Sequence, residues 1–285
     1  MGDTRIGEAE GDDPELVALR DEARSSGGTY RGQALVRLAA ALHARQRAEE
    51  ALAAAMAGRS VFDPEGRTRE AALCDRLAAR VLRDLGRLEE SAWRLEAARA
   101  ALAAEGADDL DLVTCDEQLA DLFRRLDRPG EALTRLEAAR RALADAGKQL
   151  RVARCDHNLG VVLDALGQPR EARVRMEAAL AVFQASHRRL ETASAAHNLA
   201  LVLHQVGESE AALAHLREAR EVFELAGRLE DAAGCDQNLG VVLHDIGRVA
   251  EARERFEEAR RLFDLAGDDH GIKQCDDNLL LMVDR

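Results

Sequence analysis

Apolar and small residues return every third or fourth position over long stretches of this chain, with charged residues between them. In the stretch that opens at Pro169, the apolar positions include Ala172, Met176, Ala179 and Phe183. That spacing gathers the apolar side chains on one face of an α-helix, whereas a strand would alternate them. Glycine turns separate the stretches, so the pattern predicts a succession of helix-turn-helix units.

The same pattern recurs along the chain at a constant interval. The recurring triplets stand forty residues apart and are Asn158-Leu159-Gly160, Asn198-Leu199-Ala200, Asn238-Leu239-Gly240 and Asn278-Leu279-Leu280. Self-similarity at a fixed period indicates an array, in which each unit buries its apolar face against its neighbours. We therefore expect function to lie on a surface that the units share.

Turn residues support these boundaries. Gly147, Gly227 and Gly267 each follow a predicted second helix, where glycine takes the left-handed conformation that ends a helix. Pro129 and Pro169 open the next helix, where no N–H partner is needed. At the last unit the small residue becomes Leu280, and no second helix follows, so this segment is interpreted as a terminal cap.

The spacing within a unit carries a family resemblance. A small residue such as Gly160 is followed after twelve residues by Ala172, after four more by Met176 and after another three by Ala179. This resembles the tetratricopeptide repeat over roughly residues 71 to 285. The forty-residue period exceeds the usual 34 or so, and with the Asn-Leu-Gly core it is similar to the repeats of kinesin light chain and of Leu-Gly-Asn repeat-enriched adaptor proteins. The resemblance implies an all-α fold, a right-handed α-solenoid with a C-terminal capping helix.

Four segments follow from this pattern. We expect an acidic N-terminal tail with a short helix over residues 1–30, a degenerate repeat over 31–70, five tetratricopeptide-like repeats over 71–269 and a capping helix over 270–285. The short helix should open at Asp13-Pro14-Glu15 and break at Ser25-Ser26-Gly27-Gly28.

Charge and composition narrow the class of partner. The net charge of -13 argues against nucleic acid and against an anionic membrane, because both are bound through basic surfaces. The N-terminus has no basic and apolar targeting segment, and the apolar runs are too short to span a bilayer. We expect a cytoplasmic protein, and the richness in Ala, Arg, Leu and Gly suggests a bacterial source.

Cysteines and aspartates stand at neighbouring repeat positions. The cysteines are Cys74, Cys115, Cys155, Cys235 and Cys275, with Ala195 in the remaining repeat. Equivalent positions lie too far apart for a disulfide, so the cysteines are interpreted as small apolar residues without metal or redox chemistry. The aspartates that follow them are expected to pair with second-helix arginines, such as Arg99, Arg140, Arg220 and Arg260.

The resemblance implies that the first helices line an inner groove. By repeat position, the groove residues of the later repeats are Asn158, Asn198, Asn238, Asn278, His157, His197, Val161, Leu201, Val241, His204 and His244. Carboxamides can bond the backbone of an extended peptide, and the aliphatic residues can contact its side chains. In the resembled families the matching asparagines contact bound peptide. The alternative is that each Asn hydrogen-bonds the backbone of an adjacent repeat and fixes the stacking.

The early part of the groove is arginine-rich. Its candidate partner-binding residues are Arg80, Arg83, Arg124, Arg125 and Arg154, accompanied by Arg76. They predict a partner segment that is acidic at one end. The alternative is that Glu117, Asp121 and Asp84 neutralise these arginines along the same helices.

The groove histidines leave three readings open. They are ordinary polar residues, pH-sensitive ligand contacts, or metal ligands, and no Cys or carboxylate is arranged to complete a metal shell. We expect no metal and no cofactor.

Two functional classes follow. The first is a non-enzymatic scaffold whose groove captures a protein or peptide segment. The second is a ligand- or peptide-responsive sensor, or a self-assembling module, that controls a partner protein. No acid, base and nucleophile converge in the sequence, which argues against an enzyme. The oligomeric state is expected to be monomer or homodimer.

Overall fold

The computed structural model describes residues 13–106 and 109–282, and every regular element in these ranges is a helix. Two compact units, residues 1–142 and 143–285, are described separately. None of the helices in the described ranges is long and apolar enough to cross a membrane.

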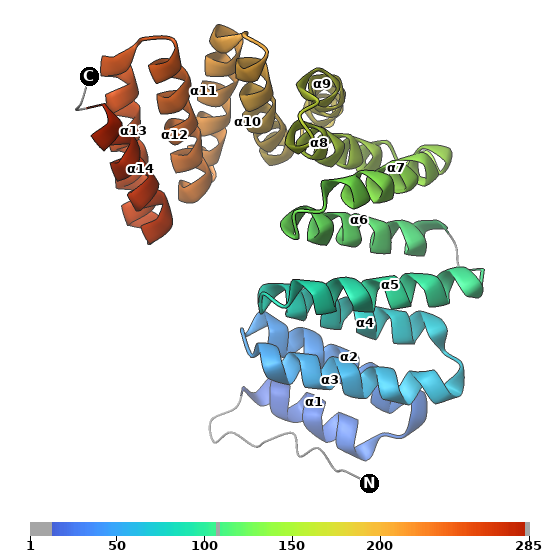
Figure 1. Ribbon diagram of the computed structural model, residues 1–285. Helices are drawn as coiled ribbons and strands as arrows, with labels where there is room; N and C mark the ends of the chain where they lie inside the picture. The colour runs from blue at the N-terminus through green and yellow to red at the C-terminus, as the bar shows by residue number, and fades with distance from the viewer. Residues whose placement is uncertain (1–12, 107–108, 283–285) are drawn as a thin grey trace. The chain divides into compact units, whose positions relative to one another are not determined.

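The first unit is a succession of antiparallel helix pairs (Figure 1). Its helices are α1 (Pro14–Ser25), α2 (Gly28–Ala44), α3 (Ala48–Phe62), α4 (Thr68–Asp84), α5 (Leu88–Ala104), α6 (Asp109–Arg125) and α7 (Pro129–Asp145), with a 3-10 turn at Asp63–Glu65 and the last residues of α7 beyond the boundary. Helix α1 is capped by the Asp13 side chain, which accepts a hydrogen bond from the Glu15 amide. The core of this unit lies between α1, α2, α3 and α4, where Leu38, Leu42 and Leu82 are fully buried.

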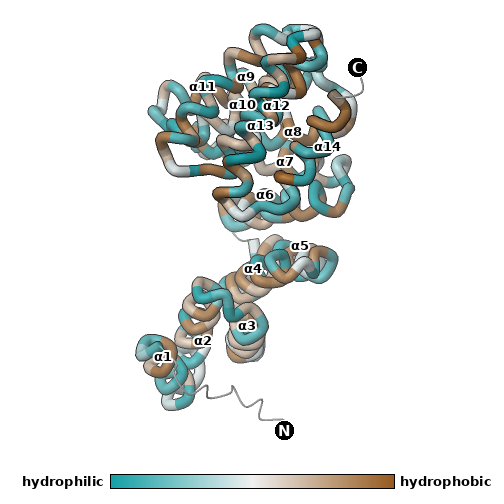
Figure 2. Tube along the Cα trace, turned by 90° about the vertical axis from the view of Figure 1, so that its left-hand side faces the viewer, coloured by the Kyte–Doolittle hydropathy of each residue, from teal (hydrophilic) through white to brown (hydrophobic). Residues whose placement is uncertain are grey.

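The second unit continues the same pattern. Its helices are α8 (Gln149–Ala165), α9 (Pro169–Ala185), α10 (Arg189–Gln205), α11 (Ser209–Leu225), α12 (Leu229–Asp245), α13 (Val249–Ala266) and α14 (Asp269–Leu281). Each helix packs on the next, and hydrophobic residues alternate with hydrophilic ones around each helix (Figure 2). The chain is thus an all-α solenoid, as the repeat pattern predicts. From α4 onward we call even-numbered helices first helices and odd-numbered ones second helices.

The turns between helices have the expected conformation. Gly147, Gly227 and Gly267 have φ values of 68°, 70° and 76°, in the left-handed region. His187 replaces glycine in the α9–α10 turn and still takes φ of 54°. The turn geometry is therefore kept even where the residue type is lost.

Small and large residues complement one another inside each helix pair. A Cβ added to Gly160 would lie 2.4 Å from Cγ of Met176, and one added to Gly240 would lie 2.8 Å from the Phe256 ring. The residues at the same two repeat positions, all of them buried, are Ala79 with Leu95, Ala120 with Leu136, Gly160 with Met176, Ala200 with Leu216 and Gly240 with Phe256. Glycine thus occurs where the partner is longer or larger than leucine, because close packing leaves a nearly constant total volume for the two side chains.

Ion pairs join successive second helices through the first helix between them. Asp75 lies 2.7 Å from Arg59 of α3 and 3.3 Å from Arg94 of α5. The same arrangement recurs at Asp116 with Arg99 and Arg135 (2.6 and 3.3 Å) and at Asp236 with Arg220 and Arg255 (2.5 and 3.1 Å). The predicted pairing of Arg99, Arg220 and Arg260 is confirmed, since Arg260 lies 2.6 Å from Asp276. The sequence reasoning did not find the second arginine of each triad.

One repeat lacks the triad altogether. At the three equivalent positions around α10 stand Leu180, Ala196 and His215. Leu180 and Ala196 are buried, so apolar contact replaces the ion pairs there. All three members change together, which indicates that the triad acts as one unit.

Candidate functional site

The first helices of the second unit are joined by side-chain hydrogen bonds along one face. Nδ2 of Asn198 lies 2.7 Å from Nε2 of His157, and Nδ2 of Asn238 lies 2.6 Å from Nε2 of His197. Each bond joins a histidine to the asparagine of the next first helix. Two of the predicted asparagines therefore take part in stacking, through a histidine side chain.

These histidines are held neutral. Burial lowers the pKa of His157 to about 4, and the neighbouring His197 adds to the shift. Burial also lowers the pKa of His197. A neutral ring whose Nε2 accepts from asparagine carries its proton on Nδ1. In His197 that nitrogen lies 3.7 Å from Sγ of Cys235.

Cys235, His197 and Asn238 thus have the connectivity of a cysteine-nucleophile site, but the thiol is inaccessible. Cys235 is fully buried, and burial raises its pKa to about 12. The thiolate is the reactive form of cysteine, so this thiol is unsuited to nucleophilic chemistry. Burial likewise raises the pKa of Cys74 to about 12 and that of Cys275 to about 11.

Aliphatic residues follow the asparagines on the same face. Val161 and Leu201 are partly buried, and Val241 is 38% exposed. Their chain neighbours Val162 and Val242 are buried in the core. Asn158, in the first of these helices, is exposed.

A pocket at the end of the second unit brings together three predicted residues. Val241 and His244 of α12 and Asn278 of α14 line it, together with Asp245, Phe256, Leu281 and Met282. Its volume is about 150 Å³. The sequence placed these residues on one surface, but a pocket depends on how α14 ends against α12 and α13.

His204 has polar partners on two sides. Its Nδ1 lies 3.0 Å from the Ser209 hydroxyl, and its Nε2 lies 2.9 Å from the Asp245 carboxylate, which also lies 3.5 Å from His244. The Asp245 side chain is 50% exposed. Water competes for this carboxylate, so the cluster lacks the excluded environment that strengthens a catalytic serine, histidine and aspartate.

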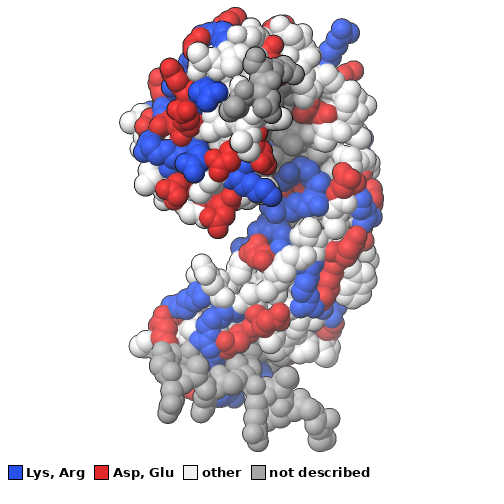
Figure 3. Space-filling view, turned by 60° about the vertical axis from the view of Figure 1, so that its left-hand side comes forward, with Lys and Arg blue, Asp and Glu red and all other residues white. Residues whose placement is uncertain are grey.

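The arginines predicted for the early groove lie in two environments. Arg83, Arg124 and Arg125 share Asp121, and Arg83 also contacts Asp84. Neutralisation by Asp121 and Asp84 therefore occurs, as one of the two sequence readings expected. Arg80 is exposed on α4, whereas Arg154 of α8 lies 3.4 Å from Glu191. Acidic and basic side chains interleave on the face in Figure 3.

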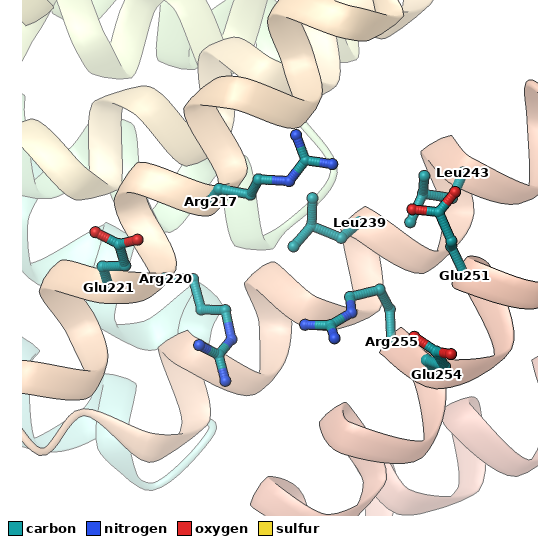
Figure 4. A pocket seen from close by; sticks show the side chains of 8 residues that line it. All are labelled: Arg217, Arg220, Glu221, Leu239, Leu243, Glu251, Glu254 and Arg255. Atoms are coloured by element: carbon teal, nitrogen blue, oxygen red, sulfur yellow. The ribbon is translucent and has the colours of Figure 1, made fainter. Parts of the chain in front are cut away.

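A further cleft, not expected from the sequence, lies on the second-helix side of the second unit. Arg217 of α11 and Arg255 of α13 point toward Leu239 of α12 (Figure 4). The cleft has a volume of about 290 Å³, and its other lining residues are Arg220, Glu221, Leu243, Glu251 and Glu254. The lining residues carry both positive and negative charges, and Arg220 and Arg255 already form ion pairs with Asp236.

Metal ligands are not grouped in the described ranges. Among residues 13–106 and 109–282, no three His, Cys, Asp or Glu side chains lie close enough to hold a metal ion.

Comparison with known proteins identifies the repeat. Residues 148–224 match the tetratricopeptide repeat family. Curated protein sequences give no match. Residues 148–224 are thus tetratricopeptide repeats, and solved structures with the same solenoid fold cover most of the chain.

Three of these relatives illustrate the likeness. BtubC (BKLC) from P. vanneervenii is 19% identical with a TM-score of 0.62, over 89% of this chain and 94% of that one. The tetratricopeptide-like repeats of a putative kinesin light chain from Podosopora anserina are 20% identical with a TM-score of 0.56, over 69% of this chain and 95% of theirs. NprR in complex with its cognate peptide NprX is 13% identical with a TM-score of 0.63, over 94% and 75%.

Proposed function

We propose that this protein is a non-enzymatic scaffold that captures a peptide or protein segment on the first-helix face of α8, α10 and α12. The observation that carries the proposal is the row of partly exposed aliphatic residues Val161, Leu201 and Val241 at one repeat position. A partner that covers this row buries apolar surface, and alternate side chains of an extended partner segment can contact the three aliphatic residues.

The asparagines have a divided role in this proposal. Each carboxamide has two N–H donors and one carbonyl acceptor. Asn198 and Asn238 use one donor to bond a histidine of the preceding repeat. The second donor and the carbonyl oxygen remain for a ligand backbone, and Asn158 is exposed at the start of the row. The asparagines would therefore both fix the stacking and contact the ligand.

Peptide selection tests the proposal while the natural partner is unidentified. A random-peptide display library is selected on the immobilised protein, and the enriched peptide is titrated against variants by fluorescence anisotropy. Leu201→Glu should weaken binding at least about tenfold, since it puts a charge in the apolar row. The control is Val174→Glu on α9, where the valine is 64% exposed on a second helix. Equal affinity for the wild type and Leu201→Glu would reject the first-helix face as the site.

A second function is a peptide-responsive regulator. It is favoured by the likeness to NprR, whose structure was solved with a cognate peptide. Binding would then change the shape of the array and so control another protein. Small-angle scattering with and without the selected peptide separates the two. An unchanged radius of gyration supports the scaffold, and a change that saturates with the peptide supports the regulator.

Partner class and location complete the proposal. The net charge of -13 disfavours nucleic acid and anionic membranes as partners. We infer a bacterial cytoplasmic protein that works without a cofactor, as a monomer or homodimer.

A further inference from the structure

Helix α14 lies beside α13 (Figure 1) and exposes apolar side chains that the preceding repeats cover. In α12 the small-residue position is Gly240, and an added Cβ there would lie 2.8 Å from the ring of Phe256 in α13. The same position in α14 is Leu280, which is 65% exposed, and the next residue, Leu281, is 69% exposed. In the part of the chain that the structure describes, no helix follows α14 to cover this face.

The ion triad of α14 is incomplete. In α12 the fully buried Asp236 lies 2.5 Å from Arg220 of the preceding second helix and 3.1 Å from Arg255 of the following one. Asp276 stands at the same repeat position in α14 and lies 2.6 Å from Arg260 of the preceding second helix. Its side chain is 46% exposed. The place that a second arginine takes in the other triads is therefore open to solvent.

The repeat geometry specifies which residues a helix at this place would present. Arg255 and Phe256 are consecutive in α13, and they reach the triad aspartate and the small residue of α12. A helix laid on α14 in the same way would put an arginine on Asp276 and the next residue on Leu280. The five complete repeats combine glycine with methionine or phenylalanine, and alanine with leucine. The residue opposite Leu280 should therefore be small, because the total volume is nearly constant.

A charged residue of α14 replaces an apolar one on the same face. Lys273 is exposed, whereas the equivalent residues of the other repeats are buried alanines or valine. Ala72 is one of these, and it packs with Leu102 of α5 in a buried cluster. Leu102 stands eight residues after Arg94, the α5 arginine that pairs with Asp75. A helix on α14 would therefore match Lys273 with an acidic residue about two turns after its arginine.

We propose that this face of α14 binds an amphipathic helix of a partner protein, laid antiparallel on α14 as a second helix lies on its first helix. The bound helix has an arginine on Asp276, an alanine or glycine on Leu280 and a glutamate or aspartate on Lys273. A guanidinium matches the planar acceptor set of a carboxylate, and an exposed apolar patch with charged residues around it is typical of an interaction site. This surface is separate from the first-helix face of α8, α10 and α12, so the inference does not rest on the proposed function.

The probe that tests the inference is a fluorescein-labelled peptide of 18 residues, with the sequence of α13 and the replacements Phe256→Ala and Phe263→Glu. These changes give it the small residue and the acidic residue that the face of α14 requires. A hydrocarbon staple joins positions 253 and 257, which are exposed in α13, because an isolated helix of this length is marginal in water. Fluorescence anisotropy with the full chain should show saturable binding.

Two variants of the protein locate the bound peptide. Leu280→Glu should weaken binding at least about tenfold, since it puts a charge in the apolar contact. The matched control is Leu225→Glu on α11, where the leucine is 79% exposed. Lys273→Glu should weaken binding about threefold to tenfold, and a peptide that carries Phe263→Lys in place of Phe263→Glu should recover it. A variant that only disturbs folding would not recover in this way.

The outcomes separate this inference from the proposed function. Leu201→Glu should bind the probe like the wild type, because Leu201 belongs to the other surface. The absence of saturable binding, wild-type affinity in Leu280→Glu, or a lack of recovery with the exchanged charges would overturn the inference. Light scattering of the protein alone provides a further check. A dimer that Leu280→Glu dissociates would also overturn the inference, since a second copy of the chain would then occupy the face.

Discussion

Replacing the ion triad of α12 tests how the repeats are held together. Asp236 is fully buried between Arg220 and Arg255, whose side chains are 19% and 35% exposed. Burial raises the pKa of Asp236 in spite of the two arginines. The charged carboxylate is therefore stabilised less in the folded chain than in water. Replacing Arg220, Asp236 and Arg255 together should therefore leave the stability of the protein nearly unchanged, whereas replacing one of them alone should lower it.

The expected magnitudes follow from this burial. Asp236→Ala removes the shared anion and should cost roughly 2–3 kcal/mol, near or below the lower end for a broken buried pair. The cost stays moderate because Arg220 also lies 3.1 Å from Glu224 and 3.6 Å from Glu258. The triple replacement Arg220→Leu, Asp236→Ala and Arg255→His copies the α9–α10–α11 repeat. It should lie within about 1 kcal/mol of the wild type, since apolar packing often substitutes for buried ion pairs.

Urea unfolding followed by circular dichroism measures both variants. Arg217→Leu is the control, because Arg217 lines the neighbouring cleft (Figure 4) and should change stability by only about 0.5 kcal/mol. A triple variant that loses as much stability as Asp236→Ala, or more, would refute the reasoning. The three positions would then contribute separately.

Three further predictions concern packing and titration. Gly240→Ala should lower the free energy of unfolding, measured in urea, by about 1–3 kcal/mol, because the added Cβ would lie 2.8 Å from the Phe256 ring. Adding Phe256→Leu should restore most of this loss. No recovery would contradict the size complementarity of the two positions. His157 has a pKa near 4 in the folded chain and is neutral there, so its contribution to the free energy of unfolding is complete above about pH 6.5 and is lost as pH falls toward 4. Relative to His157→Gln, the wild type should lose on the order of 3 kcal/mol of stability between these pH values. Parallel pH profiles of the two proteins would contradict this. The Ser209, His204 and Asp245 cluster should not hydrolyse p-nitrophenyl acetate, and turnover that disappears in Ser209→Ala would show that exposure of Asp245 does not disable it.

Local residue chemistry accounts for what the sequence predicted. Glycine turns, opening prolines and the spacing from Gly160 to Ala179 determine the helix pairs, because each acts within one unit. The pairing of Asp116 with Arg99 was also accessible, since both positions recur in register. Arg135 was missed because it lies on α7, the helix that follows Asp116, and only the packing of α7 on α6 brings it to the same carboxylate.

Side-chain partners across repeats were harder to predict. The sequence suggested that each asparagine bonds either a ligand or an adjacent backbone, whereas Asn198 bonds the His157 side chain. That choice depends on how far α10 is rotated against α8, which periodicity does not specify.

Hydrogen–deuterium exchange with a selected peptide tests the central claim most directly, because it maps where the ligand lies. The account predicts protection on the first helices α8, α10 and α12. The second helices α9, α11 and α13 should exchange as in the free protein. Protection confined to those second helices, with α8, α10 and α12 unchanged, would contradict the claim that this face captures the partner.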